Sequence, residues 1–265
     1  MATAQISTIE VHKVNKVPFD APWKWLAAGS RDIMRAPQVS LAYGAFFTAL
    51  SLLIALALYV SGAMSLVLPL AGGFLLLGPM IAVGLYETSR RLEEGEPVKL
   101  ADMVRFGVRS PGQLAFMGVF LMIIYFVWMD LAFLLFMLFL GPQAFQLDAI
   151  VPTLLFTANG LGLLIVGTLA GAVLALLVFA VTAVSIPLLM RRKVDAVTAA
   201  VTSIQAVALN PAPMLLWGIL IVAMMAIAFA TMFVGMIIIF PLIGHATWHA
   251  YRSLIVPLPA KKGKR

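Results

Sequence analysis

Long runs of apolar residues, separated by short polar segments, make up most of the chain after residue 40. A helix needs about 20 apolar residues to cross the roughly 30 Å hydrocarbon core of a bilayer. Four runs reach this length. They predict membrane-spanning helices over residues 41–61, 64–86, 114–140 and 160–190.

A fifth apolar stretch, residues 213–248, has a length between that of one span and two. Its 36 residues are too many for one ordinary spanning helix and just enough for two short ones. We predict two helices that turn near residues 230–235, which brings the count to six spans. A single tilted helix would reduce the count to five.

The positions of the cations separate these two topologies. All 18 Lys and Arg residues lie before the first span, between the second and third, between the fourth and fifth, or after the last. Six spans place all four segments on one side of the membrane, which the positive-inside rule makes the cytoplasmic side. Five spans would carry the last five cations to the other side. The pattern therefore predicts six spans with both termini in the cytoplasm.

Composition agrees with a membrane protein and removes several kinds of chemistry. Hydrophobic residues make up 63% of the 265 residues and charged residues 11%, whereas about a quarter of a soluble chain is charged. The absence of cysteine excludes disulfides, thiolate metal sites, cysteine-ligated iron–sulfur clusters and cysteine catalysis. The sequence also lacks a phosphate-binding glycine loop, a nucleophile elbow and a metalloprotease helix, so we expect no enzyme activity.

One spacing recurs ahead of the first, third and fifth spans. A proline is followed by an aromatic residue or methionine at the sixth position and by glycine at the seventh: Pro37, Tyr43 and Gly44; Pro111, Met117 and Gly118; Pro211, Trp217 and Gly218. A segment with helical periodicity precedes each proline. In the first segment an apolar face opposes a basic face, with Trp23, Leu26, Ala27, Ile33 and Met34 opposite Lys24, Arg31 and Arg35. We predict short amphipathic helices in the headgroup plane that end at a proline corner.

These patterns predict an all-α fold: a polytopic membrane helix bundle of six transmembrane helices in three hairpins, each preceded by a short amphipathic interfacial helix. A single membrane domain would cover residues 22–256, between a polar N-terminal tail, 1–21, and a basic C-terminal tail, 257–265. The recurring spacing divides the domain into three repeats, residues 22–91, 97–193 and 194–252.

Asp130 is the one acid or base well inside a predicted span. Lipid exposure of an acid costs at least roughly 2.5–3.5 kcal/mol on insertion scales, so such a residue normally faces the bundle interior and is a functional candidate. The structural alternatives are a buried acid bonded to Asn159 or a threonine, or an acid near enough to the outer surface to be hydrated. Both kinds of role stay open.

His245 and His249 are four residues apart and share one helical face. This spacing can hold a metal or haem, although two imidazoles without a third ligand are a weak signal, so we predict no metal site and no cofactor. The alternative is an interfacial helix end in which the histidines hydrogen-bond locally. The repeat aligns His249 with Glu87 and so predicts a contact between these two residues.

Aromatic, small and charged residues suggest further roles. We expect interfacial anchors at the headgroup level, namely Trp23, Trp25, Tyr86, Trp248 and Tyr251. The small-xxx-small pair Gly167 and Gly171 predicts close helix packing, within the chain or between protomers. The mixed charges around residues 87–99 are interpreted as a solvated loop.

Two motifs resemble a bacterial family of predicted integral membrane proteins of unknown function. One is the closing motif Gly244-His245-Ala-Thr-Trp248-His249-Ala-Tyr251-Arg252, and the other runs Gly78-Pro79 … Gly84-Leu85-Tyr86-Glu87 … Arg90-Arg91. The resemblance covers most of the chain, from about Trp23 to Leu254. It implies a protein of the bacterial inner membrane and supplies no activity.

The leading functional hypothesis is a non-enzymatic structural or accessory protein that acts through helix packing with a membrane complex, with itself or with lipid. A small transporter or channel that uses broken helices and Asp130 is the alternative. Haem or metal binding through His245 and His249 is the third hypothesis. The basic segments predict contact with anionic lipids at the cytoplasmic face, and no nucleic-acid partner is expected.

Overall fold

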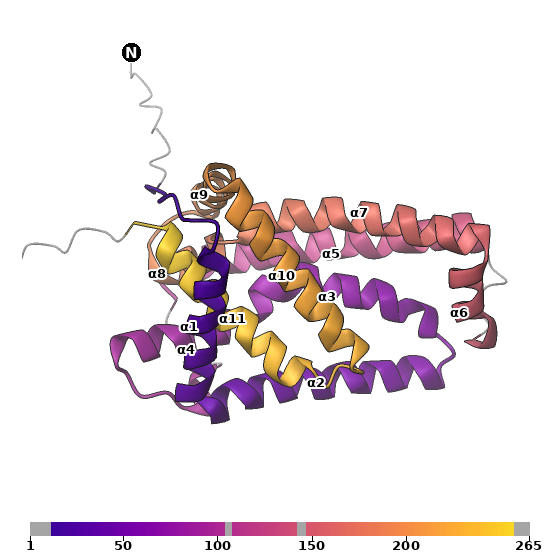
Figure 1. Cartoon of the computed structure of the whole chain (residues 1–265), viewed down its shortest axis with the longest axis horizontal. Helices are drawn as coiled ribbons and strands as arrows, with labels where there is room; N and C mark the ends of the chain where they lie inside the picture. The colour runs from indigo at the N-terminus through magenta and orange to yellow at the C-terminus, as the bar shows by residue number, and fades with distance from the viewer. Residues whose placement is uncertain (1–11, 104–107, 142–146, 257–265) are drawn as a thin grey trace, which may run out of the picture.

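Four long apolar helices, α2 (Pro37–Val60), α3 (Val67–Ile81), α5 (Pro111–Leu140) and α7 (Ala158–Thr182), run along the long axis of the molecule (Figure 1). This computed structural model describes residues 12–103, 108–141 and 147–256. The other elements are α1 (Ala21–Arg35), the 3-10 turn η1 (Met64–Leu66), α4 (Val83–Glu94), the 3-10 turn η2 (Leu100–Met103), α6 (Leu147–Phe156), α8 (Ser185–Arg191), α9 (Ala196–Leu209), α10 (Pro211–Ala230) and α11 (Met236–Leu254).

The three predicted proline corners form. Proline is the first residue of α2, α5 and α10, and the residue before each has nearly the same backbone conformation. Ala36, Ser110 and Asn210 all have φ −130°, with ψ of 57°, 68° and 52°. Proline disfavours the helical conformation in the residue before it, so the preceding segment ends and the chain turns into the bundle.

The interfacial helices are present in part. α1 and α9 form where they are predicted, whereas the described part of the middle segment contains the 3-10 turn η2, and residues 104–107 lie outside the described residues. α1 also has an inward face that sequence reasoning missed. Its buried residues are Ala21, Pro22, Trp25, Gly29 and Asp32, because this face packs against α11, while Trp23 and Met34 are exposed beside the cations.

Two spans are interrupted near a proline. The second predicted span breaks at Ala82, three residues after Pro79. The fourth span breaks between α7 and α8, a break that sequence reasoning missed. Pro187 has no N–H to donate to the carbonyl four residues earlier, at the end of α7, so the regular helix stops there.

Pro241 lies inside α11 without breaking it, since α11 is continuous through it. Pro241 leaves the carbonyl of Ile237 without its helical donor. That carbonyl lies directly against Gly44 of α2, where a methyl group in place of the glycine hydrogen would overlap it. The close approach of a neighbouring helix therefore covers the backbone group that proline frees.

Five stretches are long and apolar enough to cross a membrane: Pro37–Val60, Met64–Glu94, Pro111–Leu140, Ala158–Arg191 and Pro211–Ala230. The helix boundaries agree with the predicted turn, because α10 ends at Ala230 and α11 begins at Met236. The predicted sixth span, α11, does not meet the same standard, since its second half is polar. The count of six therefore rests on the charge pattern alone.

Burial is concentrated at one end of the molecule, where α1, α4, α8, α9 and the second half of α11 pack together (Figure 1). We call this assembly the cap. By contrast, only 11% of the most apolar stretch of α2 and 6% of that of Ala158–Arg191 are buried within the chain. The hydrophobic core is thus centred in the cap and continues along α10, the first half of α11 and the start of α5, while the spans present most of their surface outward.

A pair of glycine substitutions tests these contacts. Gly44→Ala places a methyl group on the backbone of α11, and overpacking of this kind costs about 1–3 kcal/mol. Gly167→Ala meets no atom within 4 Å and should stabilise the helix by roughly 0.5–1 kcal/mol. Thermal unfolding in mild detergent should show a lower melting temperature for the first variant and an unchanged or higher one for the second. A Gly44→Ala variant as stable as the unmodified protein would contradict the α2–α11 contact.

Candidate functional site

Polar side chains from four helices meet inside the cap. Asp32 comes from α1, Ser40 from α2, Ser89 from α4, and His245 and His249 from α11. Ser40, Ser89 and His245 are at most 1% exposed, and Asp32 is 4% exposed. Buried polar groups of this kind are retained only when their hydrogen bonds are complete, so the contacts among them define the site.

The hydrogen bonds form one chain. Ser89 donates to Asp32 Oδ2 at 2.7 Å, and its Oγ lies 2.7 Å from His245 Nδ1. Because the Ser89 proton points to the carboxylate, Nδ1 carries the proton of a neutral imidazole and donates to Ser89. His245 Nε2 then accepts from the hydroxyl of Ser40 at 2.9 Å. Both ring nitrogens of His245 are therefore used.

The chain reaches the surface of the cap at His249. His249 Nε2 lies 2.8 Å from Asp32 Oδ2, the same oxygen that accepts from Ser89. The His249 side chain is 27% exposed, against 5% for that of Asp32. Burial raises the pKa of the Asp32 carboxyl, but the hydrogen bonds from His249 and Ser89 outweigh it, so the pKa lies below its usual value.

Small residues bring the four helices close enough for these bonds. A Cβ at Gly29 of α1 would lie 2.8 Å from the backbone nitrogen of Ala246 in α11. A Cβ at Gly244 would lie 2.5 Å from the side chain of Leu85 in α4. Because the two histidines are four residues apart, both rings lie on one side of α11. This side faces the helices that the glycines allow to approach closely.

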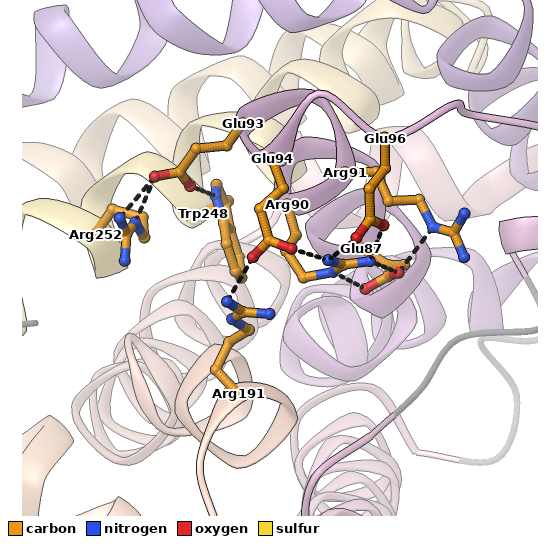
Figure 2. Close-up of polar contacts among 9 residues, drawn as sticks. All are labelled: Glu87, Arg90, Arg91, Glu93, Glu94, Glu96, Arg191, Trp248 and Arg252. Atoms are coloured by element: carbon orange, nitrogen blue, oxygen red, sulfur yellow. Dashed lines mark hydrogen bonds and ion pairs between the residues drawn. The ribbon is translucent and has the colours of Figure 1, made fainter. Parts of the chain in front are cut away.

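A second cluster, made of ions, joins α4 to its neighbours at the outer edge of the cap (Figure 2). Glu93 accepts from Trp248 Nε1 at 3.1 Å and pairs with Arg252 at 2.6 Å, both on α11. Glu94 pairs with Arg191 of α8 at 2.6 Å. The predicted solvated loop is thus wrong over this stretch, because residues 87–94 belong to a helix whose acids fasten α8 and α11.

The predicted contact between Glu87 and His249 is wrong. Glu87 is 2% exposed and pairs within its own helix, with Arg90 at 2.7 Å and with Arg91 at 2.9 Å (Figure 2). His249 instead pairs with Asp32. Equivalent positions in the recurring pattern therefore do not make equivalent contacts, since α1 provides the acid that α11 meets.

Four of the five predicted aromatic anchors lie in the cap core. Trp25, Tyr86, Trp248 and Tyr251 are at most 3% exposed, and Trp25 packs edge-on against Trp217 at 5.7 Å. Only Trp23, 55% exposed, has its ring free to lie among lipid headgroups. The interpretation as interfacial anchors is therefore wrong for the four buried residues, because the cap helices enclose them.

Asp130 lies outside this site. Its side chain is exposed on the outer face of α5 and forms no hydrogen bond or ion pair with the residues that the structure describes. The predictions of an acid facing the bundle interior, or of one bonded to Asn159, do not hold. Among its neighbours, Trp128 turns inward and donates to the carbonyl of Pro69 at 2.7 Å.

The two glycines predicted to support helix packing, Gly167 and Gly171, have different surroundings. A Cβ at Gly171 would lie 3.1 Å from the ring of Trp128, so this glycine faces α5 inside the chain. A Cβ at Gly167 would lie in open space. The pair therefore does not form one contact face within the chain.

An apolar groove of about 200 Å³ lies between α2 and α3. Ser51 and Tyr125 supply its only side-chain hydroxyl groups, and Ser51 contacts the sulfur of Met236. The remaining lining is Ile54, Ala55, Leu58, Val67, Leu70, Ala71, Phe74, Leu77, Ile81, Phe229 and Phe233. Such a lining suits hydrocarbon and offers little to a charged solute.

Comparison with known proteins agrees with the predicted resemblance. Residues 67–191 match the model of a family described as "Predicted integral membrane protein (DUF2189)". The chain is similar to this family over just under half its length. The matched segment begins with the first residue of α3 and ends with the last residue of α8. It contains the Gly78-Pro79 motif, whereas the closing motif lies outside it. No curated protein and no solved structure matches the chain.

Sequence reasoning singled out the histidines and missed Asp32, Ser40 and Ser89. Asp32 stood among basic residues and was assigned to no site. Its position was still readable, because Trp25, Gly29 and Asp32 are spaced by four and three residues and so share a helix face. Ser40 and Ser89 carry no comparable signal, since Ser40 is a single hydroxyl in an apolar helix and Ser89 stands among other polar residues of α4.

Substitution of Asp32 tests the network. Asp32→Asn should lower the melting temperature, because loss of a buried hydrogen-bond partner costs about 1–3 kcal/mol. Asp130→Asn is the matched control and should leave the melting temperature unchanged, since Asp130 is exposed and has no bonded partner among the described residues. Equal effects of the two substitutions on thermal unfolding would argue against the network.

The stabilities of the unmodified protein and of the Asp32→Asn variant should also depend differently on pH. The folded-state pKa of Asp32 lies below its ordinary value of 3.8, so its carboxylate contributes stability above about pH 4. This contribution is lost as the pH falls through the lowered pKa. The difference in melting temperature between the unmodified protein and Asp32→Asn should therefore be largest near neutral pH and shrink toward pH 3. A difference that grows with acidification would contradict this assignment.

Proposed function

We propose that this chain is a non-enzymatic accessory protein of the bacterial inner membrane that acts through its outward helix surfaces, by packing against another membrane protein or a second copy. One observation carries the proposal: the hydrogen-bonded and ionic clusters described above lie in the cap, while the spans leave most of their apolar surface uncovered. Apart from the exposed carboxyl of Asp130, the chemistry available at the outer surface of the described spans is mainly helix packing and lipid contact.

α7 has the least covered surface among the candidate spans. Along its length Leu161, Ile165, Leu169, Val173 and Leu176 follow one another at helical spacing, and each is between 46% and 66% exposed. A stripe of branched aliphatic residues without polar groups fits a neighbouring apolar helix or lipid. We take this stripe as the contact surface.

The basic residues support the orientation that we propose, with both termini and the cap in the cytoplasm. Lys24, Arg31 and Arg35 of α1 are exposed beside Trp23, which suits the anionic headgroups of the inner leaflet. The three hairpins suggested by the proline corners would then all begin and end at this face. We propose no nucleic-acid partner.

A transporter or channel remains the second candidate because two spans are broken and a groove lies between α2 and α3. Discontinuous helices often form substrate sites near the midplane. Against this, the groove is apolar and Asp130 lies away from it. Asp130→Asn should leave any solute flux in reconstituted vesicles unchanged, and a loss of flux would restore this candidate.

Haem binding is the weakest candidate. Neither ring nitrogen of His245 is free, because each is hydrogen bonded to a serine. We therefore propose no cofactor. An absorption spectrum of the protein purified from its native membrane should lack a Soret band, and a Soret band that His245→Ala removes would overturn this view.

Photo-cross-linking tests the accessory role. A benzoylphenylalanine placed at Leu169, on the outward stripe of α7, should give a discrete protein adduct in intact membranes. The same group at Phe46, exposed on α2, is the matched control and should give mostly lipid adducts. Lipid adducts alone at both positions, together with a monomeric protein in mild detergent, would remove the proposal.

A further inference from the structure

We infer that α10 and α11 form a re-entrant hairpin, which enters the membrane from the cap side, turns near the bilayer midplane and returns to the same side. The chain would then cross the membrane completely four times, through α2, the second span, α5 and the fourth span. This inference concerns depth in the membrane and does not depend on the proposed partner-binding role.

The first support is the depth of the turn, residues 231–235. The carbonyl of Phe233 accepts from the hydroxyl of Thr48 at 3.2 Å. Thr48 is the twelfth of the 24 residues of α2, so about half of that helix, roughly 18 Å at 1.5 Å per residue, continues beyond the turn. Figure 1 shows the same relation, since the turn between α10 and α11 lies well short of the far ends of α2, α5 and α7.

The second support is the length of the apolar part of α11. Residues 236–243 are apolar, whereas residues 244–252 contain the two histidines, Trp248 and Arg252 and belong to the cap. Eight residues rise about 12 Å, which is close to half of the roughly 30 Å hydrocarbon thickness. A full crossing would draw His245 and the cap end of α11 into hydrocarbon.

The third support is the character of the turn. Its middle residues are Met232, Phe233 and Val234, and the first and third are 69% and 55% exposed. Loops in water are usually polar, so a turn that presents large apolar side chains fits hydrocarbon surroundings. Phe229 and Phe233 line the apolar groove between α2 and α3, so this end of the hairpin lies against an apolar surface.

The fourth support is how the turn completes its hydrogen bonds. Irregular backbone within a bilayer is tolerated only where its polar groups are satisfied. Thr231 Oγ1 accepts from the amide of Gly235 at 2.9 Å and donates to the carbonyl of Ala228, also at 2.9 Å. Met232 and Phe233 both have positive φ, 52° and 66°, an unfavourable conformation for such residues that the surrounding bonds hold in place.

Single-cysteine labelling tests the inference, because the chain contains no cysteine of its own. Val234→Cys probes the turn, while Ser61→Cys, at the far end of α2, and Lys193→Cys, beside the cap, are matched exposed controls. A membrane-impermeant maleimide should label Ser61→Cys from outside the cell and Lys193→Cys in inverted vesicles. Val234→Cys should react at least tenfold more slowly than either control from both sides, and as fast as both after denaturation in SDS.

Labelling of Val234→Cys from outside at the rate of Ser61→Cys would overturn the re-entrant hairpin. Labelling of Lys193→Cys from outside would instead overturn the proposed orientation and leave the hairpin intact. A nitroxide attached at Val234 gives a second measurement, in which collision with oxygen should exceed that at Ser61 and collision with a polar nickel complex should be lower. The reverse order would also count against a turn at the midplane.

Discussion

Where hydrocarbon replaces water, every polar group needs a partner inside the protein, and the rest of this structure depends on that constraint. The chain meets it largely by gathering its charged and hydrogen-bonded side chains at one end, with Asp130 on α5 as an exposed exception among the described residues. Asp32, Ser89, His245 and Ser40 form an uninterrupted line of hydrogen bonds, and the acids of α4 fasten α8 and α11. The cap thus combines these polar contacts with many of the buried apolar side chains, whereas the spans bury little of their surface within the chain.

The same constraint applies to the backbone wherever a helix is interrupted. At the break after α3, the hydroxyl of Tyr43 donates to the carbonyl of Ile81. At the break after α7, Ser203 accepts from the amide of Val184. At Pro241, where α11 continues, Gly44 lies against the freed carbonyl. A residue from a neighbouring segment contacts each of these three backbone groups. The packing of the helices therefore accommodates the interruptions.

The separation of the polar network in the cap from the apolar surfaces of the spans bears on function. A buried serine–histidine–aspartate chain can suggest catalysis, yet here its members bond to one another and sit 4% exposed or less, apart from His249. Because each bond is complete, the network fixes the relative positions of α1, α2, α4 and α11. A rigid cap of this kind holds the cap-side ends of the spans in place. The outer surfaces of the spans stay exposed to lipid or to a partner helix.

The sequence by itself determined the class of the protein and the proline corners, and its charges predict an orientation. These follow from local patterns: run length, the restriction that proline places on its neighbour, and the one-sided distribution of Lys and Arg. Even the turn near residue 231 could be placed from the length of the apolar stretch.

Only the tertiary structure decided which residues meet. Asp32 rather than Glu87 faces His249, four predicted anchors are enclosed by the cap, and Asp130 faces outward. Such outcomes depend on helix crossings set by Gly29, Gly44 and Gly244, which bring together residues up to 217 positions apart. A linear pattern records which side of a helix is apolar, but it does not record which neighbour covers that side.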